Sequence, residues 1–341
     1  MMSEETTKIA LAALLHDIGK FWQRAGRPGS HAEASAAFVD EFKHLFPYEW
    51  LDDLRDGTGN HHNPARKEIE KIVRIADWLA STERVEELGI SQSDPERTPL
   101  IPIAAKVEFR EEKPKNWKDW GYRLKALRLE ESCVFPTTQV QVSSEDYSAL
   151  REEFKNELNQ MRIIRDYFGL VSLLALLRKY TTYIPSATPW EKDEEYRTLP
   201  DISLYEHLRI TCAIATCLGK LYPDHLDALY RRDSNVEGQL VARLLRGDFS
   251  GIQNFLYRIT RAEGEAEFRG TAKRLRGRSF FLTLLGDITA DWLVRELDVS
   301  PANILFCGGG RFDLIIGADE STKQKLEELG QRLQNWLVDE F

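Results

Sequence analysis

The chain has 341 residues and a mass of 39.3 kDa, which is too long for one ordinary hydrophobic core and predicts two domains. Hydrophobic residues make up 42% and charged residues 30% of the sequence, a balance that excludes an intrinsically disordered chain. The net charge of -9 is unfavourable for a protein that coats nucleic acid on its own, so any such contact requires a local basic patch.

Membrane segments and covalent cross-links are also without support. The N-terminal residues MMSEETTKIA carry acids where a signal peptide needs a basic flank, and the Leu-rich stretch 167–177 is too short to span a bilayer. The four cysteines form no CxxC pair, so neither a zinc knuckle nor a disulfide framework is indicated. We therefore expect a cytoplasmic protein with buried thiols and no membrane contact.

The first part of the chain has the periodicity of helices. Apolar residues recur at helical spacing from Lys8 to about Glu87, which predicts an all-α domain. The stretch 89–102 (GISQSDPERTPLIP) interrupts this rhythm with prolines and turn-forming residues. We therefore place a first domain at residues 1–99 and a second at 100–341.

The second part has a mixed pattern. Strands are predicted at Ile101–Phe109 and Leu240–Phe249, and long helices at Ser148–Thr182 and Ala272–Leu297. A hairpin is predicted around residues 308–310, and residues 184–200, with three prolines and a charge run, are predicted to form a surface loop. This combination is typical of an α+β domain.

Metal-binding residue types occur in the predicted helical domain. His16 and Asp17 are adjacent in the apolar helical stretch LAALLHDIGKFWQRAG. Burying two polar side chains there would cost free energy unless they bind a partner. His61 and His62 follow in GNHHNPARKE, and Asp77 lies among apolar neighbours in EIEKIVRIADWLASTER. Capping or hydrogen bonding within a helical bundle is the alternative role for His16 and Asp17.

These residues can converge only if the helix is interrupted between His62 and Asp77. On one unbroken helix, His62 and Asp77 would lie roughly 22 Å apart, too far to share a metal ion. Asn63-Pro64 supplies the break, because the residue before a proline disfavours the α conformation. Imidazole and carboxylate ligands suit divalent transition metals such as Mn, Ni or Co, with Mg also possible, and a metal held there would activate water against phosphorus.

The motifs HDIGK, HAEAS, NHH and ADWLASTER together resemble the HD domain of the large subunit of type III CRISPR effector complexes. The resemblance implies a metal-dependent nuclease that acts on single-stranded DNA. It assigns four metal ligands and four catalytic positions, with two residues in both sets. The implied metal ligands are His16, Asp17, His62 and Asp77, and the implied catalytic residues are His16, Asp17, Lys20 and His61.

Two further residues near this site have open roles. Lys20 lies one turn after His16 on the same helix face, where it could face a phosphate. His31 opens the HAEAS helix and is either an outer ligand or an ordinary residue at a helix N-terminus.

A phosphate-binding pattern follows in the second domain. The string GDFSGIQNFLYRI predicts a strand, a glycine-containing turn and a helix start, with Ser250 as a fair N-cap. Unpaired N–H groups at such a helix start can bind phosphate, although an ordinary strand-to-helix turn has the same pattern. A local basic patch follows, which is either a phosphate contact or a solvated helix end. The patch consists of Arg269, Lys273, Arg274, Arg276 and Arg278.

In the same CRISPR family, GDFSGIQ, AKRLRGRSF and GGGRFDLII resemble the first palm domain, and PDISLYEHLRITCAIATCL resembles the segment that leads into it. The resemblance implies a ferredoxin-like palm of the nucleotidyl cyclase and polymerase type, with extra helices, that binds ATP. The implied ATP-binding residues are Asp248, Phe249, Ser250, Gly251, Lys273, Arg274, Arg276, Arg278, Gly309 and Gly310.

This palm is not expected to make cyclic oligoadenylates by itself. Palms of this type hold metal ions through acids at the hairpin, but Gly310 and Arg311 stand at those positions and no GGDD occurs in the sequence. Asp248 and Asp313 remain as single carboxylates. An acid-bearing second palm is therefore expected to be necessary.

The leading hypothesis is the N-terminal portion of a type III large subunit, working with the other subunits of a guide-RNA complex. Its expected substrate is single-stranded DNA, and target RNA is the expected activator through the complex. One alternative is an HD phosphohydrolase of free nucleotides, against which the basic patch and the palm-like hairpin count. The other is a non-catalytic scaffold, against which the intact His and Asp residues count.

Overall fold

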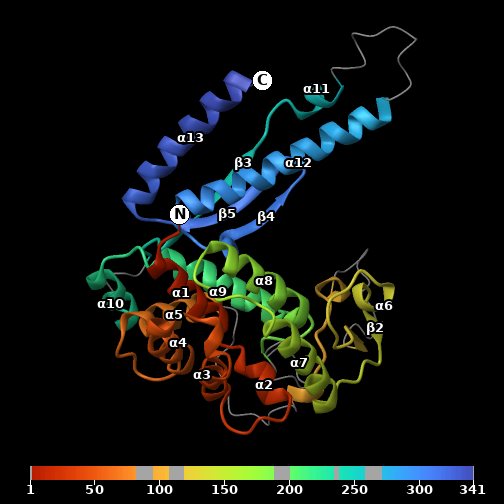
Figure 1. Cartoon of the computed structure of the whole chain (residues 1–341), viewed down its shortest axis with the longest axis vertical. Helices are drawn as coiled ribbons and strands as arrows, with labels where there is room; N and C mark the ends of the chain where they lie inside the picture. The colour runs from red at the N-terminus through yellow and green to blue at the C-terminus, as the bar shows by residue number, and fades with distance from the viewer. Residues whose placement is uncertain are drawn as a thin grey trace.

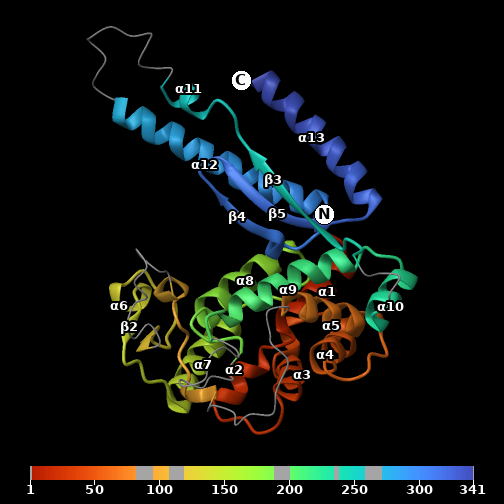
Figure 2. The same cartoon turned by 180° about the vertical axis from the view of Figure 1, so that it is seen from behind.

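The computed structural model describes residues 2–81, 95–106, 119–187, 200–233, 238–257 and 271–340. They form a mostly helical lobe followed by a small α+β lobe, and α8 and α9 lie beneath the sheet of the second lobe in both views (Figures 1 and 2). The principal helices of the first lobe are α1 (Glu4–Leu15), α2 (Gly19–Arg24), α3 (His31–Glu41), α4 (Leu51–Gly59), α5 (Glu68–Ala80), α6 (Glu131–Val134), α7 (Ser144–Leu158), α8 (Tyr167–Thr181), α9 (Leu204–Leu218) and α10 (Pro223–Arg231).

Local chemistry sets the boundaries of the first helices. Ser3 caps α1 by accepting a hydrogen bond from the Thr6 amide, and Ser30 forms a capping box with Glu33 at the start of α3. Gly19 begins α2 against α3, where a Cβ atom would lie 1.9 Å from the His31 carbonyl oxygen. Only glycine permits this close approach, which places the turn after α1 beside the start of α3.

The prediction of an all-helical first segment is confirmed for the part of it that the structure describes, residues 8–81. The helices share one hydrophobic core with the later helices, because α9 packs on both α1 and α5. This core includes Leu14 of α1, Val73 of α5, Leu177 of α8 and Leu208 of α9, all of them fully buried. The domain division at residue 99 stays a prediction.

Two predicted elements of the middle segment are wrong. Residues 148–182 form two helices, because α7 ends at Leu158 and Asp166 starts α8 by accepting a hydrogen bond from the Gly169 amide. The predicted strand Ile101–Phe109 is instead a 3-10 helix at Ile103–Lys106, and residues 107–109 lie outside the described part. The amide of Ile101 donates a hydrogen bond to the carbonyl of Pro200, and Ile101 belongs to no strand.

Two short segments complete the helical lobe. The strands β1 (Trp120–Gly121) and β2 (Thr137–Thr138) form a small antiparallel pair. Of the predicted surface loop, residues 188–199 lie outside the described part, and the residues before them are held by a bridge between Pro185 and Ser203. The remaining short 3-10 turns are Lys43–Leu45, Tyr48–Trp50 and Pro95–Arg97.

The α+β lobe contains an antiparallel sheet in the order β3-β5-β4. The predicted strand at 240–249 is confirmed as β3 (Ala242–Asp248), and the predicted hairpin as β4 (Ile304–Gly308) and β5 (Arg311–Gly317). The predicted long helix is confirmed as α12 (Thr271–Glu296), and α11 (Ile252–Tyr257) and α13 (Glu320–Glu340) complete the lobe. Phe312, Leu314 and Ile316 of β5 form its core with residues of α12.

A buried hydrogen-bond network joins the two lobes. Asn303, in the 3-10 turn Pro301–Asn303, accepts a hydrogen bond from the Thr216 hydroxyl of α9. Its side-chain amide donates to the carbonyl of Ala213 in α9 and, at 2.8 Å, to the carbonyl of Ile315 in β5. Arg209 of α9 also donates to the carbonyl of Ile304 at the start of β4. The sheet is therefore fixed to α9 by polar contacts.

All four cysteines are free, and Cys133, Cys212 and Cys217 are buried as predicted, whereas Cys307 is partly exposed. Among the described residues, no helix has both the length and the apolar character needed to cross a membrane.

Candidate metal centre

The turn that follows α1 places His16 and Asp17 in the interior. His16 is 0% exposed and Asp17 is 2% exposed, so neither residue caps a helix at the surface. The Nδ1 atom of His16 lies 2.8 Å from the carbonyl oxygen of Ala13, to which it can donate, so the lone pair of Nε2 faces the centre. A backbone acceptor of this kind orients histidine ligands of metal ions.

The turn between α4 and α5 contributes His61 and His62. The Nδ1 atom of His61 lies 2.8 Å from the carbonyl oxygen of Thr58, which orients this ring in the same way as His16. Glu70 of α5 accepts hydrogen bonds from the amides of Arg66 and Lys67 and from the side chain of Asn60. The predicted break at Asn63-Pro64 is confirmed, since α4 ends at Gly59 and α5 begins at Glu68.

Two groups of possible ligands result, and both contain Asp17. The first is formed by Asp17, His31, His61 and His62, and the second by His16, Asp17, Asp77 and His207. Within each group the ligand atoms lie within 4.8 Å of one another. The four residues predicted as one metal site are therefore distributed over two groups, with His62 in the first and His16 and Asp77 in the second.

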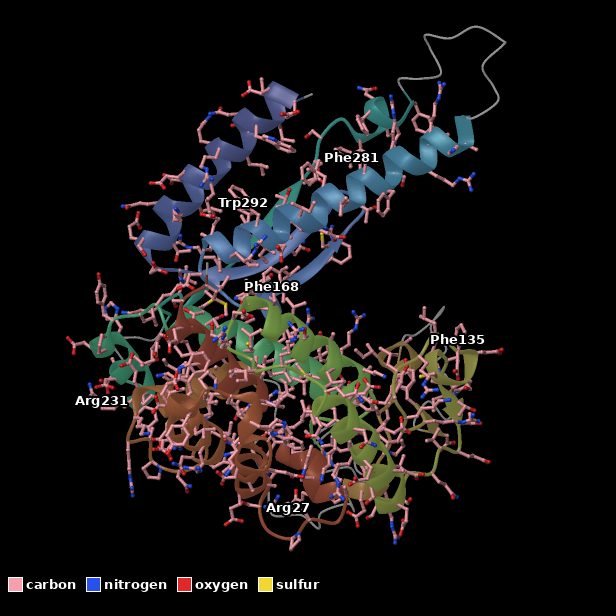
Figure 3. The ribbon with its side chains drawn as sticks, viewed as in Figure 1. Arg27, Phe135, Phe168, Arg231, Phe281 and Trp292 are labelled. Atoms are coloured by element: carbon pink, nitrogen blue, oxygen red, sulfur yellow. The ribbon has the colours of Figure 1, made fainter. Side chains whose placement is uncertain are left out.

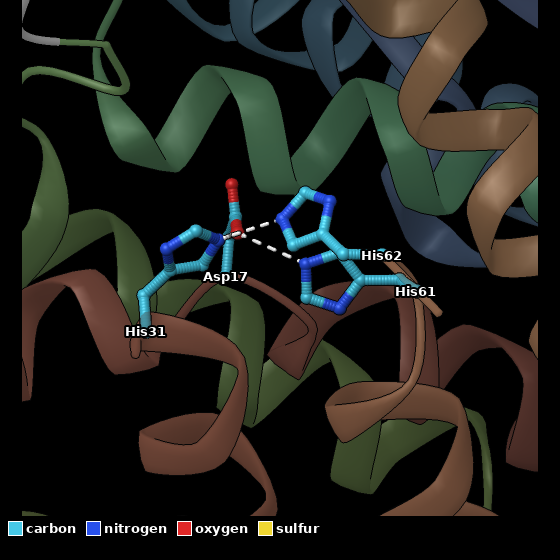
Figure 4. Close-up of side chains that lie close together, drawn as sticks. All are labelled: Asp17, His31, His61 and His62. Atoms are coloured by element: carbon cyan, nitrogen blue, oxygen red, sulfur yellow. Dashed lines mark hydrogen bonds and ion pairs between the residues drawn. The ribbon is translucent and has the colours of Figure 1, made fainter. Parts of the chain in front are cut away.

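In the first group, Oδ1 of Asp17 faces the histidines (Figure 4). It lies 3.4 Å from Nε2 of His31 and 3.6 Å from Nε2 of His61. The Nε2 atoms of His31 and His62 lie 2.8 Å apart. His31, whose role the sequence left open, thus lies in the centre and comes from the first turn of α3.

In the second group, Oδ2 of Asp17 lies 3.7 Å from Nε2 of His16 and 3.3 Å from Nε2 of His207. Oδ1 of Asp77 lies 3.6 Å from Nε2 of His16 and 3.1 Å from Nε2 of His207. Two buried carboxylates and two buried imidazoles therefore converge on one point.

Sequence reasoning missed His207, which comes from α9, some 130 residues after Asp77 in the chain. The available signal was a histidine at an apolar face of the predicted helix LYEHLRITCAIATCL, where it aligns with buried Leu204, Leu208 and Thr211. That pattern is also typical of a histidine in an ordinary core, so spacing alone does not identify a ligand.

The donor atoms fit a bound cation. Among the described residues, Nε2 of His16, His61 and His207 and Oδ1 of Asp17 are buried atoms without a hydrogen-bond partner. Leaving one such atom unpaired costs about 1–3 kcal/mol, and four at one place need a compensating group. Divalent cations bound in the two groups would satisfy them, one beside His61 and Oδ1 of Asp17 and the other beside His16 and His207.

The ionisation states of the acids and histidines in the centre also suit a bound metal ion. Burial tends to raise the pKa of Asp17, but Lys20 and the surrounding imidazoles outweigh it and hold this pKa well below its usual value. Asp77 likewise keeps a lowered pKa despite burial, because His16 and His207 lie against it. Burial lowers the pKa of His31 and of His62 to about 4. At neutral pH the acids are ionised and these two imidazoles are neutral, the states that bind metal.

Lys20 is engaged within the centre. Its ammonium group contacts Oδ2 of Asp17 and donates to the carbonyl of Ser186 at 2.9 Å. Its contact with a phosphate stays a prediction, and any such contact would have to form beside these two partners.

The second predicted site is assembled only in part. The turn 248–251 meets the β4–β5 hairpin, because the amide of Phe249 donates to the carbonyl of Gly310 at 2.9 Å. Gly310 has a φ of 82°, and a Cβ atom there would lie 2.2 Å from Cδ1 of Ile252. Asp248 pairs in register with Arg311 across the sheet. The strand-to-helix turn and the glycine hairpin therefore form one surface.

The basic patch is divided. Lys273, Arg274 and Arg276 lie exposed in the first turns of α12, whereas Arg278 contacts the carbonyl of Phe255 and lies over its ring. Arg269 falls outside the described residues. Asp313 is bound by Arg246 at 2.7 Å, and this contact lowers the pKa of the Asp313 carboxyl.

Two protein families match parts of the chain. Residues 1–82 match the HD domain, and residues 241–341 match domain B of the Csm1 subunit. The first match covers His16, Asp17, His61, His62 and Asp77, and the second covers the sheet of the α+β lobe. His207 lies outside both.

Similar proteins extend the likeness over nearly the whole chain. A Methanocaldococcus jannaschii protein, described as the CRISPR system single-strand-specific deoxyribonuclease Cas10/Csm1 of subtype III-A, is 34% identical over 95% of this chain and 43% of its own length. An Enterococcus italicus protein of the same description is 27% identical over 98% of this chain and 45% of its own length. The chain thus spans less than half the length of these relatives.

Solved structures give the same result. The crystal structure of Csm1 from T. onnurineus matches 99% of this chain and 43% of its own, with a TM-score of 0.70 and 26% identity. Csm1 in the Csm1–Csm4 subcomplex of the type III-A CRISPR-Csm interference complex matches equally, with a TM-score of 0.70 and 26% identity. A Csm1–Csm4 cassette in complex with AMPPNP also has a TM-score of 0.70.

Proposed function

Because this chain is a homologue of the N-terminal portion of the Cas10/Csm1 proteins of subtype III-A CRISPR systems, we propose that its HD domain is a metal-dependent nuclease that cleaves single-stranded DNA. The observation that carries the proposal is the cluster of buried, unpaired ligand atoms around Asp17. Such a cluster is costly to a fold and is the arrangement that a catalytic metal site requires.

We assign the ligands by group. Asp17, His31, His61 and His62 would hold one divalent cation, and His16, Asp17, Asp77 and His207 a second, with one oxygen of Asp17 in each group. When bound, such cations lower the pKa of a water molecule and offset charge on a phosphate. Mn, Ni or Co suit this mixture of nitrogen and oxygen ligands, and Mg suits it less well.

The chain's own residues prepare the site for this chemistry. The carbonyls of Ala13 and Thr58 fix the rings of His16 and His61, so that the lone pairs face the metal positions before substrate arrives. Lys20 holds Oδ2 of Asp17 and is the cation best placed to meet a phosphate oxygen at the edge of the centre. The half-buried His31 and the exposed His62 mark the side from which a flexible strand can enter, since the other ligands are buried.

Cleavage of a labelled single-stranded oligonucleotide in the presence of Mn tests the proposal. We expect activity that EDTA abolishes, that is weak on duplex DNA, and that the double variant His16→Ala with Asp17→Ala lacks while keeping its helix content. Cleavage that survives in a rigorously purified double variant would contradict the assignment. Hydrolysis of free nucleotides in place of oligonucleotides would favour the phosphohydrolase alternative, and no stoichiometric metal binding would favour the scaffold.

For the α+β lobe we propose a palm-like nucleotide-binding half with a ferredoxin-like arrangement. The order β3-β5-β4, the contact between Phe249 and Gly310, and the likeness to a Csm1–Csm4 cassette in complex with AMPPNP support it. The turn at Asp248–Gly251, the glycines of the hairpin and the start of α12 would contact ATP. Since Gly310 and Arg311 replace acids at the hairpin, cyclic oligoadenylate synthesis would require an acid-bearing second palm.

We further propose that this chain works in the cytoplasm inside a guide-RNA-containing complex, with target RNA as the activator. The likeness to Csm1 in its subcomplex with Csm4 supports such an assembly. The test is incubation with ATP and Mn, first with the chain alone and then in the assembled complex with target RNA. Cyclic product from the chain alone would refute the proposed division of labour.

A further inference from the structure

A stack of aromatic and cationic side chains lies beside the metal centre, on α5 and α10. Trp78 and Tyr230 have nearly parallel rings, with their centroids 6.2 Å apart and an interplanar angle of 14°. The guanidinium carbon of Arg74 lies 4.9 Å from the centre of the Trp78 ring and 5.7 Å from that of Tyr230. The guanidinium of Arg232 lies 4.3 Å from the Trp78 ring.

This stack adjoins the ligands directly. Trp78 follows the ligand Asp77 in α5, and Arg74, one turn earlier, donates to the carbonyl of Asn63, the residue after His62. His62 is exposed and belongs to the open side of the centre. Arg74 and Trp78 therefore lie next to the segment that carries His62, on the open side of the centre.

The charges of the stack have no acidic partner among the described residues. Within the described part of the chain, no carboxylate forms an ion pair with Arg74 or Arg232, whereas the neighbouring Asp227 is paired with Lys71. In a chain with a net charge of -9, two guanidinium groups without a described acidic partner make this a locally basic site. Arg232 also has a left-handed backbone, with φ 55° and ψ 42°, at a cap where glycine or asparagine is preferred. An arginine there is conformationally costly, which suggests a use for its side chain.

We propose that Arg74, Trp78 and Arg232 form a platform that binds the bases and phosphates of single-stranded nucleic acid next to the metal centre and so positions the strand for cleavage. The proposal rests on the nuclease function proposed above. The exposed Arg232 guanidinium, which lies on the half-buried Trp78 ring, offers a plane on which any base can stack, and arginine also binds phosphates, so the combination fits a single strand without sequence preference. Tyr230 serves chiefly to secure α10, because its hydroxyl accepts a hydrogen bond from the amide of Ala65 at 2.7 Å.

Binding of fluorescent oligothymidylate to the full chain in EDTA tests the platform without cleavage. An abasic oligonucleotide of the same length serves as the comparison strand, because it keeps the phosphates and lacks the bases. We expect the wild-type chain to bind oligothymidylate more tightly than the abasic strand. Trp78→Leu should weaken oligothymidylate binding by roughly 5- to 150-fold, the range for loss of a stacked base, and should remove this preference.

Matched variants separate the platform from the fold. Arg232→Gly removes the guanidinium and suits the left-handed cap, so it should weaken binding while the fold stays intact. Arg231→Ala is the control, because Arg231 is the neighbouring arginine at the end of α10, pairs with Asp233 and faces outward (Figure 3). Trp78→Phe should keep most of the preference. Equal binding of both strands by the wild type, or unchanged binding in Arg232→Gly and Trp78→Leu, would overturn the platform.

Hydrolysis of bis(p-nitrophenyl) phosphate with Mn distinguishes this proposal from the nuclease proposal, because this substrate has no base to reach the platform. Arg232→Gly should hydrolyse it at the wild-type rate while its KM for oligonucleotide rises. Loss of both activities in Arg232→Gly would overturn the platform by showing a structural effect on the centre. If the wild type hydrolyses neither substrate, the nuclease proposal fails, while the binding assay in EDTA still decides whether the platform exists.

Discussion

Replacing His207 by alanine tests the ligand that the sequence did not predict. His207 comes from α9, yet its Nε2 atom lies 3.1 Å from Asp77 and 3.3 Å from Asp17. The variant leaves the group of Asp17, His31, His61 and His62 unchanged. We therefore expect a selective effect, in which one class of metal sites is lost and the other is retained.

The size of the effect follows from linkage between binding and folding. A metal ion at 100 times its dissociation constant stabilises the folded chain by about 2.7 kcal/mol. Changing a residue that only supports a ligand typically weakens metal binding by roughly 10- to 100-fold, so we take a 100-fold loss for a ligand itself. At the same metal concentration the stabilisation then falls to about 0.4 kcal/mol, a loss of about 2.3 kcal/mol.

Equilibrium dialysis with Mn measures the stoichiometry, and urea unfolding with and without Mn measures the stabilisation. Comparing each variant with and without metal removes the cost of the packing that alanine loses. His225→Ala is the control, since His225 is an exposed histidine of α10 outside both ligand groups. Wild-type stoichiometry and stabilisation in His207→Ala would refute its role as a ligand.

The remaining predictions concern the turns and the ionisation of the centre. Gly19→Ala should destabilise the chain by roughly 3 kcal/mol or more, measured by urea unfolding, because its Cβ atom would collide with the backbone at His31. Gly310→Ala should weaken ATP binding in calorimetry and leave cleavage of single-stranded DNA unchanged, because the collision with Ile252 and the strain at φ 82° both fall in the α+β lobe. The metal-free chain should lose stability as the pH falls from about 6.5 to about 4. The unfolded histidines take up protons over this range, while folded His31 and His62, with pKa values of about 4, do not. His31→Gln with His62→Gln should flatten that dependence in urea unfolding.

The sequence predicted the elements whose determinants are local. The helix that carries Asp77 and the hairpin at Gly309 and Gly310 both follow from periodicity and turn residues, and the structure has both. The break at Asn63-Pro64 was equally local, because proline restricts the residue before it. The long helix predicted across residues 148–182 was wrong because its periodicity continues across the cap at Asp166.

The composition of the centre depended on tertiary packing. The predicted ligands His16, Asp17, His62 and Asp77 were identified from the separate motifs HDIGK, NHH and ADWLASTER. His207 enters only because α9 packs on α1 and α5. The role of His31 was open in the sequence, since a histidine at a helix start has several uses, and only the structure places its Nε2 atom 3.4 Å from Asp17. Contacts between segments distant in the chain leave little trace in the spacing of a single sequence.

Helix α9 bears on the metal centre and on the sheet at the same time. His207 lies between Asp17 and Asp77, and two residues later Arg209 holds the carbonyl of Ile304 at the start of β4. If the proposed nucleotide shifts the sheet on binding, α9 would carry part of that displacement to the His207 imidazole between Asp17 and Asp77. Reciprocity then requires that metal binding change the affinity of the sheet for that nucleotide by the same factor. The proposed metal site and the proposed nucleotide site would thus be coupled through α9 and the hydrogen bonds of Asn303.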